Sequence, residues 1–530
     1  MVSRLVTLLP RWRPVLENEK FEMAGRHLKC NDGHMSDTTR RGFLKQAAMA
    51  AAMAPLLDSG ARAASVPAAT ETPRRPNILL VISDQYRWDF ICGYGRNPMD
   101  FTPNLDAMLK RGTAFEQAYT NQPLCSPARG CLFTGQYATQ NGVWKLGPGL
   151  NPGAVTLATE LGKAGYSTNY IGKWHLAPNS RKDPASHGYV PPEFRGGFKD
   201  LWQASNELEL TSHAYHGTLW DGNGQAMTFD GIYRADYLNQ LATDFLRQKH
   251  EKPFFLVLSQ LEPHQQNDLN GFSPPKGFDE RFRNPYVPPD LRPFPGDWPY
   301  QLANYYGDCR SIDDCMGRLF QVLKEQNLEE NTVVIFLSDH GCHFRTRNAE
   351  YKRSPHDSST HVPLLIQGPG FNRAMKVGEM VSLVDLAPTL LDYLGLPVPD
   401  SMQGASFLPL LDQPEARAKW KNEVFIQISE TETARALRTP EWTYVALAPD
   451  ADLHTDPGST VYQDYQLYNN FADPAQIINL AGRADPPALV QYAGNRSMRE
   501  ITEDLRQRLA DRMERAGESR PKISRWPFYP

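Results

Sequence analysis

The chain has 530 residues, of which 41% are hydrophobic, and a formal net charge of −4 at pH 7. This length allows one large core and a second, smaller domain, and the composition is typical of a soluble globular protein. The small net charge gives no general reason to expect nucleic acid or an anionic membrane as a partner.

Residues 1–63 lack the pattern of a folded domain. The pair Arg40-Arg41 precedes an alanine-rich apolar run, Gln46–Leu57, and a candidate cleavage site ends at Ala63. This order is typical of a twin-arginine export signal, and the run is shorter than the roughly 20 residues that a membrane span needs. A basic, disordered N-terminus is the alternative. Because Met35 gives a leader of ordinary proportions, we take it as the candidate true start.

The export interpretation has consequences for location and for the next segment. Residues 64–75 are rich in Ala, Pro and Thr and predict a linker. We expect the twin-arginine machinery to export the folded protein, which would then be periplasmic or secreted.

Residues 76–414 predict an α/β domain. Three apolar runs, Asn77–Ser83, Phe254–Gln260 and Thr332–Ser338, are too apolar for half-exposed strands and should be buried on both faces. A fourth candidate strand, Tyr166–Ile171, follows the helical segment Ala154–Ala164. We therefore expect a large mixed, mostly parallel sheet sandwiched by helices.

Residues 415–530 predict a smaller α+β domain with an antiparallel sheet and one helix. The expected strands are Val424–Ile428, Thr443–Leu447 and Tyr465–Leu467. The segment Ser497–Ala516 is a charged amphipathic helix, because its apolar residues recur on one face and should pack on the sheet.

Polar side chains follow each predicted strand of the large sheet. They are Asp84 and Gln85, Lys173 and His175, His264, and Asp339 and His340. In open α/β sheets, ligand sites lie beyond the carboxyl ends of the strands, so we expect these side chains to meet. Two carboxylates and an amide oxygen suit Ca²⁺, while His340 would also admit Mn²⁺ or Mg²⁺.

The segment from Cys125 to Gly135 predicts a short helix with a sulfur at its positive end. Ser126 is a good N-cap, Pro127 suits the first helical position, and Gly135 is a plausible stop. The helix dipole and Arg129 would then favour an anion beside Cys125. A buried structural cysteine is the alternative. The other cysteines lack the spacing of a disulfide framework or a zinc site, so we expect mostly reduced, buried thiols.

The run of Cys125, Pro127, Arg129, Leu132 and Thr134-Gly135 resembles the signature of the type I sulfatases of the alkaline phosphatase superfamily. The resemblance implies that a formylglycine-generating enzyme oxidises Cys125 to formylglycine, whose hydrate is the nucleophile. It also implies a calcium site formed by Asp84, Gln85, Cys125, Asp339 and His340. Gln85 replaces an aspartate that many members have, which leaves the site one negative charge poorer.

Further segments extend the resemblance and imply roles for four residues. Gly172-Lys173-Trp174-His175 matches a family segment in which the lysine holds the hydrate and the histidine acts as base on the covalent intermediate. His264 is the candidate acid for the leaving group, although the second proline of its segment is missing. Lys352 lies at the family's spacing from Val362-Pro363 and would bridge sulfate and leaving oxygen. His343, His356 and His361 are further histidines without an assigned role.

The resemblance implies a sulfuric ester hydrolase that releases sulfate. Aryl, small alkyl and glycan sulfates stay open as substrates, and the predicted export and aromatic residues such as Trp220 and Tyr233 favour a sulfated glycan. Two alternatives stay open: a phosphonate monoester or phosphodiester hydrolase of the same superfamily, and a non-catalytic sulfated-glycan-binding protein.

Overall fold

The computed structural model describes residues 75–180, 182–483 and 496–526. The chain divides after Thr70 into two units, and all of the described residues belong to the second unit. The leader predicted over residues 1–63, and the linker except for Arg75, therefore lie outside the described residues. Within the described ranges, no helix has the length and apolar character of a membrane span.

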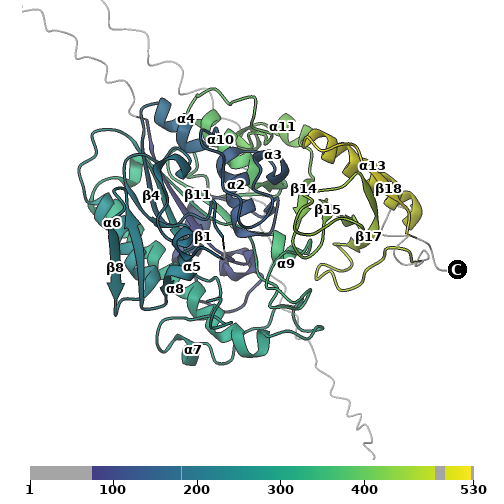
Figure 1. Ribbon diagram of the computed structural model, residues 1–530, viewed down its shortest axis with the longest axis horizontal. Helices are drawn as coiled ribbons and strands as arrows, with labels where there is room; N and C mark the ends of the chain where they lie inside the picture. Colours follow the sequence, from purple (N-terminus) through teal and green to yellow (C-terminus); the bar gives the residue numbers. More distant parts are fainter. Residues whose placement is uncertain (1–74, 181, 484–495, 527–530) are drawn as a thin grey trace, which may run out of the picture. The chain divides into compact units, whose positions relative to one another are not determined.

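A sheet of eleven strands is the centre of the larger part of the protein (Figure 1). Its middle consists of five parallel strands in the order β10 (Thr332–Ser338), β1 (Asn77–Ser83), β9 (Phe254–Gln260), β4 (Ser167–Lys173) and β5 (Trp202–Ser205). Mostly antiparallel pairings extend both flanks. Beyond β10 lie β11 (Leu364–Gln367), β2 (Thr113–Phe115) and β12 (Met375–Val377), and beyond β5 lie β7 (His216–Asp221), β6 (Ser212–His213) and β8 (Ala226–Asp230). At one edge, β12 is parallel to β2.

Both faces of this sheet are buried under helices, which explains why its central strands are apolar throughout. Alternate residues of β1 point to opposite faces: Leu79 and Val81 join one core cluster, and Ile78, Leu80 and Ile82 join the other. The first cluster includes residues of α1 (Pro103–Arg111), α6 (Arg234–Leu246) and α8 (Trp298–Glu325). The second includes residues of α2 (Cys125–Thr134), α4 (Leu157–Lys163) and α10 (Leu386–Tyr393).

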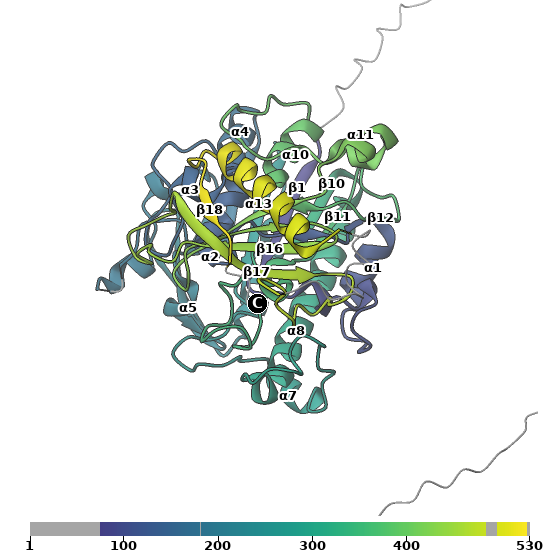
Figure 2. The same ribbon diagram turned by 90° about the vertical axis from the view of Figure 1, so that its right-hand side faces the viewer.

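A second sheet of five strands follows in the order β14 (Val424–Ile428), β15 (Ala434–Arg438), β16 (Trp442–Leu447), β17 (Val461–Asn469) and β18 (Lys522–Ser524). The helix α13 (Met498–Arg515) covers one face through Ile501, Leu505, Leu509 and Met513 (Figure 2). The opposite face carries Val424, Ile426 and Ile428, which pack with Tyr119 and Met380 of the larger part. The strands β14, β15 and β16 thus divide their side chains between two cores.

The expected fold class is confirmed, and several element bounds are as predicted. β1, β9, β10 and β14 have the predicted residues, and α13 lies within the predicted segment Ser497–Ala516. β4 continues to Lys173, two residues past the predicted end, because it pairs with both β5 and β9. β15 and β18 had no prediction, and β18 pairs parallel to β17, so the second sheet is antiparallel only over its first four strands.

The remaining α-helices and strands of the described residues are short. They are α3 (Ala138–Asn141), α5 (Leu208–Thr211), α7 (Phe278–Arg281), α9 (Asp357–Thr360), α11 (Pro414–Lys419), and the paired strands β3 (Ala118–Tyr119) and β13 (Val381–Ser382). The six described cysteines are free thiols, five of them buried, which confirms the prediction of mostly reduced, buried cysteines.

Candidate active site and metal centre

The carboxyl ends of the central strands lie level with one another. Ser83 at the end of β1 is in register with Ser338 of β10 and with Gln260 of β9, and Gly172 of β4 is in register with Ser259. The residues that follow these strands therefore emerge at one edge of the sheet, as the strand positions in the sequence predicted.

Cys125 is the first residue of α2, which also faces this edge. The predicted N-cap at Ser126 is wrong: the helix begins at Cys125, and Leu124 precedes it in extended conformation without a side-chain cap. Pro127 is thus the third helical residue, which is tolerated because the first turn needs no backbone donors. Gly135 ends the helix as predicted, with a positive φ of 64° and its N–H bonded to the carbonyl of Cys131.

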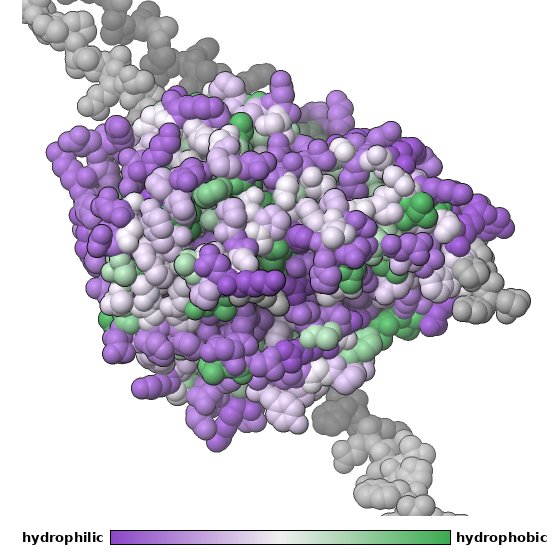
Figure 3. All heavy atoms as spheres, in the orientation of Figure 1, coloured by the Kyte–Doolittle hydropathy of each residue, from purple (hydrophilic) through white to green (hydrophobic). Residues whose placement is uncertain are grey.

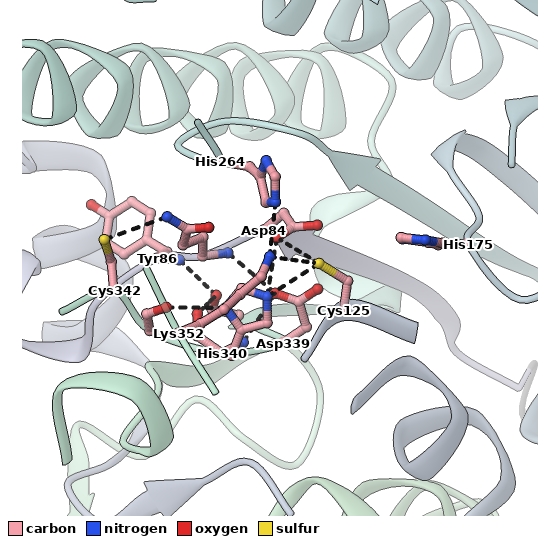
Figure 4. Close-up of polar contacts among 12 residues, drawn as sticks. Asp84, Tyr86, Cys125, His175, His264, Asp339, His340, Cys342 and Lys352 are labelled. Carbon is pink, nitrogen blue, oxygen red and sulfur yellow. Dashed lines mark hydrogen bonds and ion pairs between the residues drawn. The ribbon is translucent and has the colours of Figure 1, made fainter. Parts of the chain in front are cut away.

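Four buried side chains bring potential metal ligands together at this point (Figure 4). One ligand atom from each of Asp84, Cys125, Asp339 and His340 lies within 4.8 Å of the others. The Cys125 Sγ is 3.3 Å from His340 Nε2 and 3.6 Å from Asp84 Oδ1. The sequence predicted all four residues.

Gln85, the fifth predicted ligand, has a fully buried side-chain oxygen without a partner. Its Nε2 donates to Cys342 Sγ at 3.4 Å, while its Oε1 accepts no hydrogen bond among the described residues. A buried polar atom of this kind is costly unless something satisfies it. Two carboxylates, an imidazole and a free amide oxygen form a donor set that fits a divalent cation.

Two buried cations neutralise the carboxylates. Arg129 Nε is 3.1 Å from Asp339 Oδ2, and Arg129 Nη2 is 3.2 Å from Asp84 Oδ2. Lys173 Nζ lies 2.8 Å from Asp84 Oδ2 and 2.8 Å from Glu209 Oε1. Burial alone would raise the pKa of Asp84, but Lys173, with further cations nearby, holds that pKa below its ordinary value.

Lys352 and His264 meet beside the sulfur. Lys352 Nζ is 3.0 Å from Cys125 Sγ and 2.8 Å from His264 Nε2. The other ring nitrogen, His264 Nδ1, lies 2.6 Å from the carbonyl oxygen of Gln265 and must donate to it, so Nε2 is the acceptor. Burial, followed by the Lys352 ammonium, lowers the pKa of His264, which favours this neutral tautomer.

His175 lies on the other side of Cys125 in Figure 4, between two glutamates that the sequence did not predict. Its Nε2 is 3.1 Å from Glu207 Oε1, and its Nδ1 is 3.8 Å from Glu209 Oε1. Burial and Lys173 act to lower the pKa of His175, but contacts with Cys125 and the glutamates outweigh them and raise it to about 9. Both glutamates follow the carboxyl end of β5. Since ligand sites lie beyond the carboxyl ends of parallel strands, a prediction of β5 would have pointed to them.

A cavity of about 700 Å³ opens over Cys125, His175, His264 and Lys352. Polar residues form much of its wall, including His187, Asn267, Glu350, Arg353, Glu430 and His454. Glu430 and His454 belong to the segment that carries the second sheet, so both sheets contribute to the wall. The face of the molecule in Figure 3 is likewise predominantly hydrophilic.

The three histidines without an assigned role do not line this cavity. His343 Nε2 contacts the carbonyl oxygen of Lys352, and His356 contacts Ser354 and Tyr468. His361 is stacked between Trp88 and Tyr119. All three are buried residues of the surrounding structure.

Comparison with known proteins identifies the family. The family model "Sulfatase" matches residues 76–396, and the model "N-sulphoglucosamine sulphohydrolase, C-terminal" matches residues 350–515. An ulvan-active sulfatase of Formosa agariphila is 28% identical over 485 residues, which is 86% of this chain and 88% of that protein. An uncharacterized sulfatase of Escherichia coli K12 is 32% identical over 371 residues, which is 63% of this chain and 71% of that protein.

The fold agrees with this assignment. A structural-genomics target of Bacteroides fragilis that is named as a sulfatase superposes with a TM-score of 0.69 at 23% identity, covering 85% of this chain and 98% of that one. Since the sulfatase model spans more than half of the sequence, the chain belongs to the formylglycine-dependent sulfatases of the alkaline phosphatase superfamily and is a sulfuric ester hydrolase.

Proposed function

We propose that this sulfatase removes sulfate from a glycan with formylglycine formed from Cys125 and a bound divalent cation, with Ca²⁺ as the expected ion and Mn²⁺ or Mg²⁺ as the alternatives. One observation carries the proposal. The buried Cys125 Sγ lies 3.0 Å from Lys352 Nζ, at the N-terminus of α2 and among the potential metal ligands. A sulfate ester is anionic, so a site must neutralise it before a nucleophile can attack.

The cation would be held by Asp84, Gln85, Asp339 and His340, together with residue 125. When bound, it would supply positive charge at the sulfate oxygens. A thiol is a soft ligand, whereas Ca²⁺ prefers oxygen, so the sulfur of Cys125 here stands for an oxygen of the oxidised residue. The unpaired Gln85 Oε1 supports this ligand set.

Formylglycine at residue 125 would supply, as its hydrate, two oxygens on one carbon, which a thiol does not have. The roles of the surrounding side chains follow from charge. Arg129 holds Asp84 and Asp339 in place, and Lys173 adds a second fixed cation at Asp84. Both are fully buried, so their charges act without screening by water.

Protons would move through three side chains. Lys352 donates to the neutral His264 Nε2, and this pair would deliver a proton to the departing alcohol oxygen. His175, on the opposite side of residue 125, would accept a proton as sulfate leaves; the Cys125 contact, the largest of the contacts that raise its pKa, is absent once residue 125 is oxidised. Separate acid and base groups suit a reaction in which the alcohol leaves first and sulfate second.

The cavity supports a saccharide as the substrate. Its volume of about 700 Å³ is large for a simple alkyl sulfate, and its lining contains the amides, histidines and charged groups that hydroxyl groups bind. Arg353 pairs with Glu350 at 2.8 Å and with Glu430 at 3.5 Å. These three charged side chains line the cavity wall next to Lys352. The relative from Formosa agariphila is active on ulvan, which favours a sulfated polysaccharide fragment.

We also propose the export route that the leader predicts. A formylglycine-generating enzyme would oxidise Cys125 in the cytoplasm, and the twin-arginine machinery would then carry the folded protein to the periplasm or the medium. Expression of the full chain, followed by N-terminal analysis of the protein outside the cytoplasm, should find a start close to residue 64.

The activity test compares one aryl alcohol supplied as its sulfate, phosphate and phosphonate esters, followed by a panel of sulfated saccharides. We expect the sulfate ester to be turned over fastest, and Cys125→Ala to abolish turnover. Peptide mass analysis should find residue 125 converted from thiol to aldehyde. Preference for the phosphonate would instead identify a phosphonate monoester hydrolase, and an unmodified thiol with binding but no turnover would identify a glycan-binding protein.

A further inference from the structure

Glu207 is a buried carboxylate that lies between two histidines of the cavity. Its Oε1 is 3.1 Å from His175 Nε2, and its Oε2 accepts a hydrogen bond from His187 Nδ1. Both histidines line the cavity together with Glu207. Burial acts to raise the pKa of Glu207, but the two histidines outweigh it and lower that pKa, so Glu207 is a carboxylate.

The backbone fixes Glu207 relative to both histidines. Beyond the paired ends of β4 and β5, the N–H of Trp174 bonds to the carbonyl of Ser205, and the N–H of His175 bonds to the carbonyl of Asn206 at 2.7 Å. On the other side, the N–H of Glu207 bonds to the carbonyl of His187 at 2.8 Å. The segment that carries Glu207 is therefore held between the segments that carry the two histidines.

The neighbouring Glu209 has a different partner. Its Oε1 lies 2.8 Å from Lys173 Nζ, whose charge it balances, and it is 3.8 Å from His175. Glu207 makes the shorter contact with His175. Neither ring nitrogen of His175 makes a directed hydrogen bond within the described residues, so its contact with Glu207 is an ion pair. Contacts of catalytic groups often tighten only when substrate binds.

We propose that Glu207, anchored by His187, is a positioning residue that orients His175 for the release of sulfate. The inference rests on the proposed function, in which His175 accepts a proton as sulfate leaves. A carboxylate on one ring nitrogen of a histidine fixes which nitrogen carries the proton and stabilises the charged ring. Glu207 would act in this way through His175 alone, without touching the substrate's sulfate.

The two-step order of product release gives a specific test. We expect Glu207→Gln to slow only the second step, so a chromogenic aryl sulfate should give a rapid burst of about one alcohol per active site, followed by slow turnover. The kcat should fall about 10- to 100-fold, the range found when a partner of a functional side chain is removed. The KM should fall in parallel, which leaves kcat/KM unchanged.

Two further variants keep the test decisive. His187→Gln, which removes the anchor of Glu207 but no charge next to His175, should change kcat in the same direction by a smaller factor. Asp268→Asn is the matched control, because Asp268 pairs with His213 at 2.7 Å in an exposed position outside the described cavity wall. It should keep the kinetics of the wild-type protein.

The outcomes separate this inference from the proposed function. If the wild-type protein with an oxidised residue 125 releases no sulfate, both the proposed function and the positioning role of Glu207 are wrong. A wild-type protein that releases sulfate, together with a Glu207→Gln variant that shows no burst or loses kcat/KM as much as kcat, would overturn the positioning role alone. If Glu207→Gln does not fold, the same burst in His187→Gln supports the role, and its absence overturns it.

Discussion

Gln85 shows at the scale of one residue how the site differs from the common pattern of its family. Many members have an aspartate at this position, whereas Gln85 offers a neutral amide oxygen that is buried and unpaired. Ligand charge is one of the factors that set the affinity of a calcium site. The glutamine should therefore make the metal site weaker than an aspartate or glutamate would.

The first prediction tests Gln85 with two variants of similar size, one that adds a negative charge and one that removes the side-chain oxygen. Gln85→Glu should bind Ca²⁺ more tightly, on the order of tenfold, because it adds a negative ligand. Gln85→Leu should bind it about 10- to 100-fold more weakly, because it removes the oxygen. Calcium titration calorimetry on protein stripped with a chelator measures both, and the shift of Tm with added calcium provides a second readout. Equal affinities of wild type and Gln85→Leu would exclude Gln85 as a ligand.

His361 is a second informative residue, because its burial makes folding sensitive to acid. The ring is stacked on Trp88 at 4.0 Å and on Tyr119 at 4.7 Å, and its Nε2 donates to the carbonyl of Glu116. Burial lowers the pKa of His361 to about 3. In the unfolded chain it titrates near pH 6.5, so the folded state must keep neutral a ring that would otherwise take up a proton.

The second prediction follows from the sign of this shift. Stability from the neutral His361 is complete above about pH 6.5 and is lost as the pH falls toward 3. At pH 5 the loss should be about 2 kcal/mol, from 1.5 pH units at about 1.36 kcal/mol each. His361→Phe keeps the stack but loses the bond to Glu116, so at pH 8 it should be about 1 kcal/mol less stable. Urea unfolding should find that this difference closes or reverses at pH 5, and a difference that is equal at both pH values would contradict the argument.

At the scale of elements, the close packing of β4 against β9 determines where Lys173 lies. Gly172 has a φ of 105°, and a Cβ at that position would be 2.0 Å from the carbonyl oxygen of Ser259. Since only a glycine allows that approach, the strand can deliver Lys173 to the level of Asp84. Gly165, before the same strand, has a φ of 91° and open space around its Cβ position.

The third prediction uses these two glycines as a matched pair. Gly165→Ala should cost about 1–3 kcal/mol from backbone strain alone. Gly172→Ala carries the same strain and an overpacking cost of about 1–3 kcal/mol more, and it should also lower activity, because β4 must move away from β9. Urea unfolding and steady-state kinetics on both variants measure this. Equal losses of stability, or full activity in Gly172→Ala, would show that β4 has room that the structure does not suggest.

The elements also show how far sequence reasoning extends. β1, β9 and β10 were predictable to the residue, because strands buried on both faces are continuously apolar. β5 was not, because its four residues, Trp202–Ser205, include polar side chains and are too few for a pattern. Glu207 and Glu209 were missed as a result. The start of α2 was predicted two residues late, because the Ser126-Pro127 pair resembles a cap although the first turn accepts proline anyway.

The predicted site residues divide in the same way. Asp84, His264 and Asp339 followed from the rule about strand ends, so their meeting at one edge could be predicted physically. Lys352 lies in a loop between β10 and α9, where no periodicity applies, and only the family resemblance pointed to it. The wall of the cavity contributed by Glu430 and His454 could not be predicted, because it depends on how the second sheet packs on the first.

At the scale of the whole molecule, the second sheet is part of the active-site architecture. Its face of Val424, Ile426 and Ile428 packs on the larger part, and its loops carry Glu430 and His454 into the cavity wall. Because the cavity needs both parts, a change in their packing should affect substrate binding as well as stability.

An ion pair between the buried Arg438 and the partly buried Asp357 joins the two parts directly. Arg438 of β15 donates from Nε and Nη2 to the two oxygens of Asp357 at the start of α9, each at 2.8 Å. Burial acts to raise the pKa of Asp357, but Arg438 outweighs it and keeps that pKa below its ordinary value. Asp357 therefore stays charged. Its low pKa depends on Arg438, which belongs to the second sheet.

The fourth prediction is that removing this arginine costs more than removing the pair. Arg438→Ala should destabilise the protein by less than the roughly 3–5 kcal/mol of a fully buried pair, because the partly buried Asp357 carboxylate loses its cation but keeps the hydrogen bond from Gln476. Adding Asp357→Asn should restore part of that loss, because the uncompensated charge is then gone. A double-mutant cycle measured by urea unfolding tests this, with the KM for a sulfated saccharide followed in parallel. If the two single losses simply add, Arg438 and Asp357 do not couple the second sheet to the larger part.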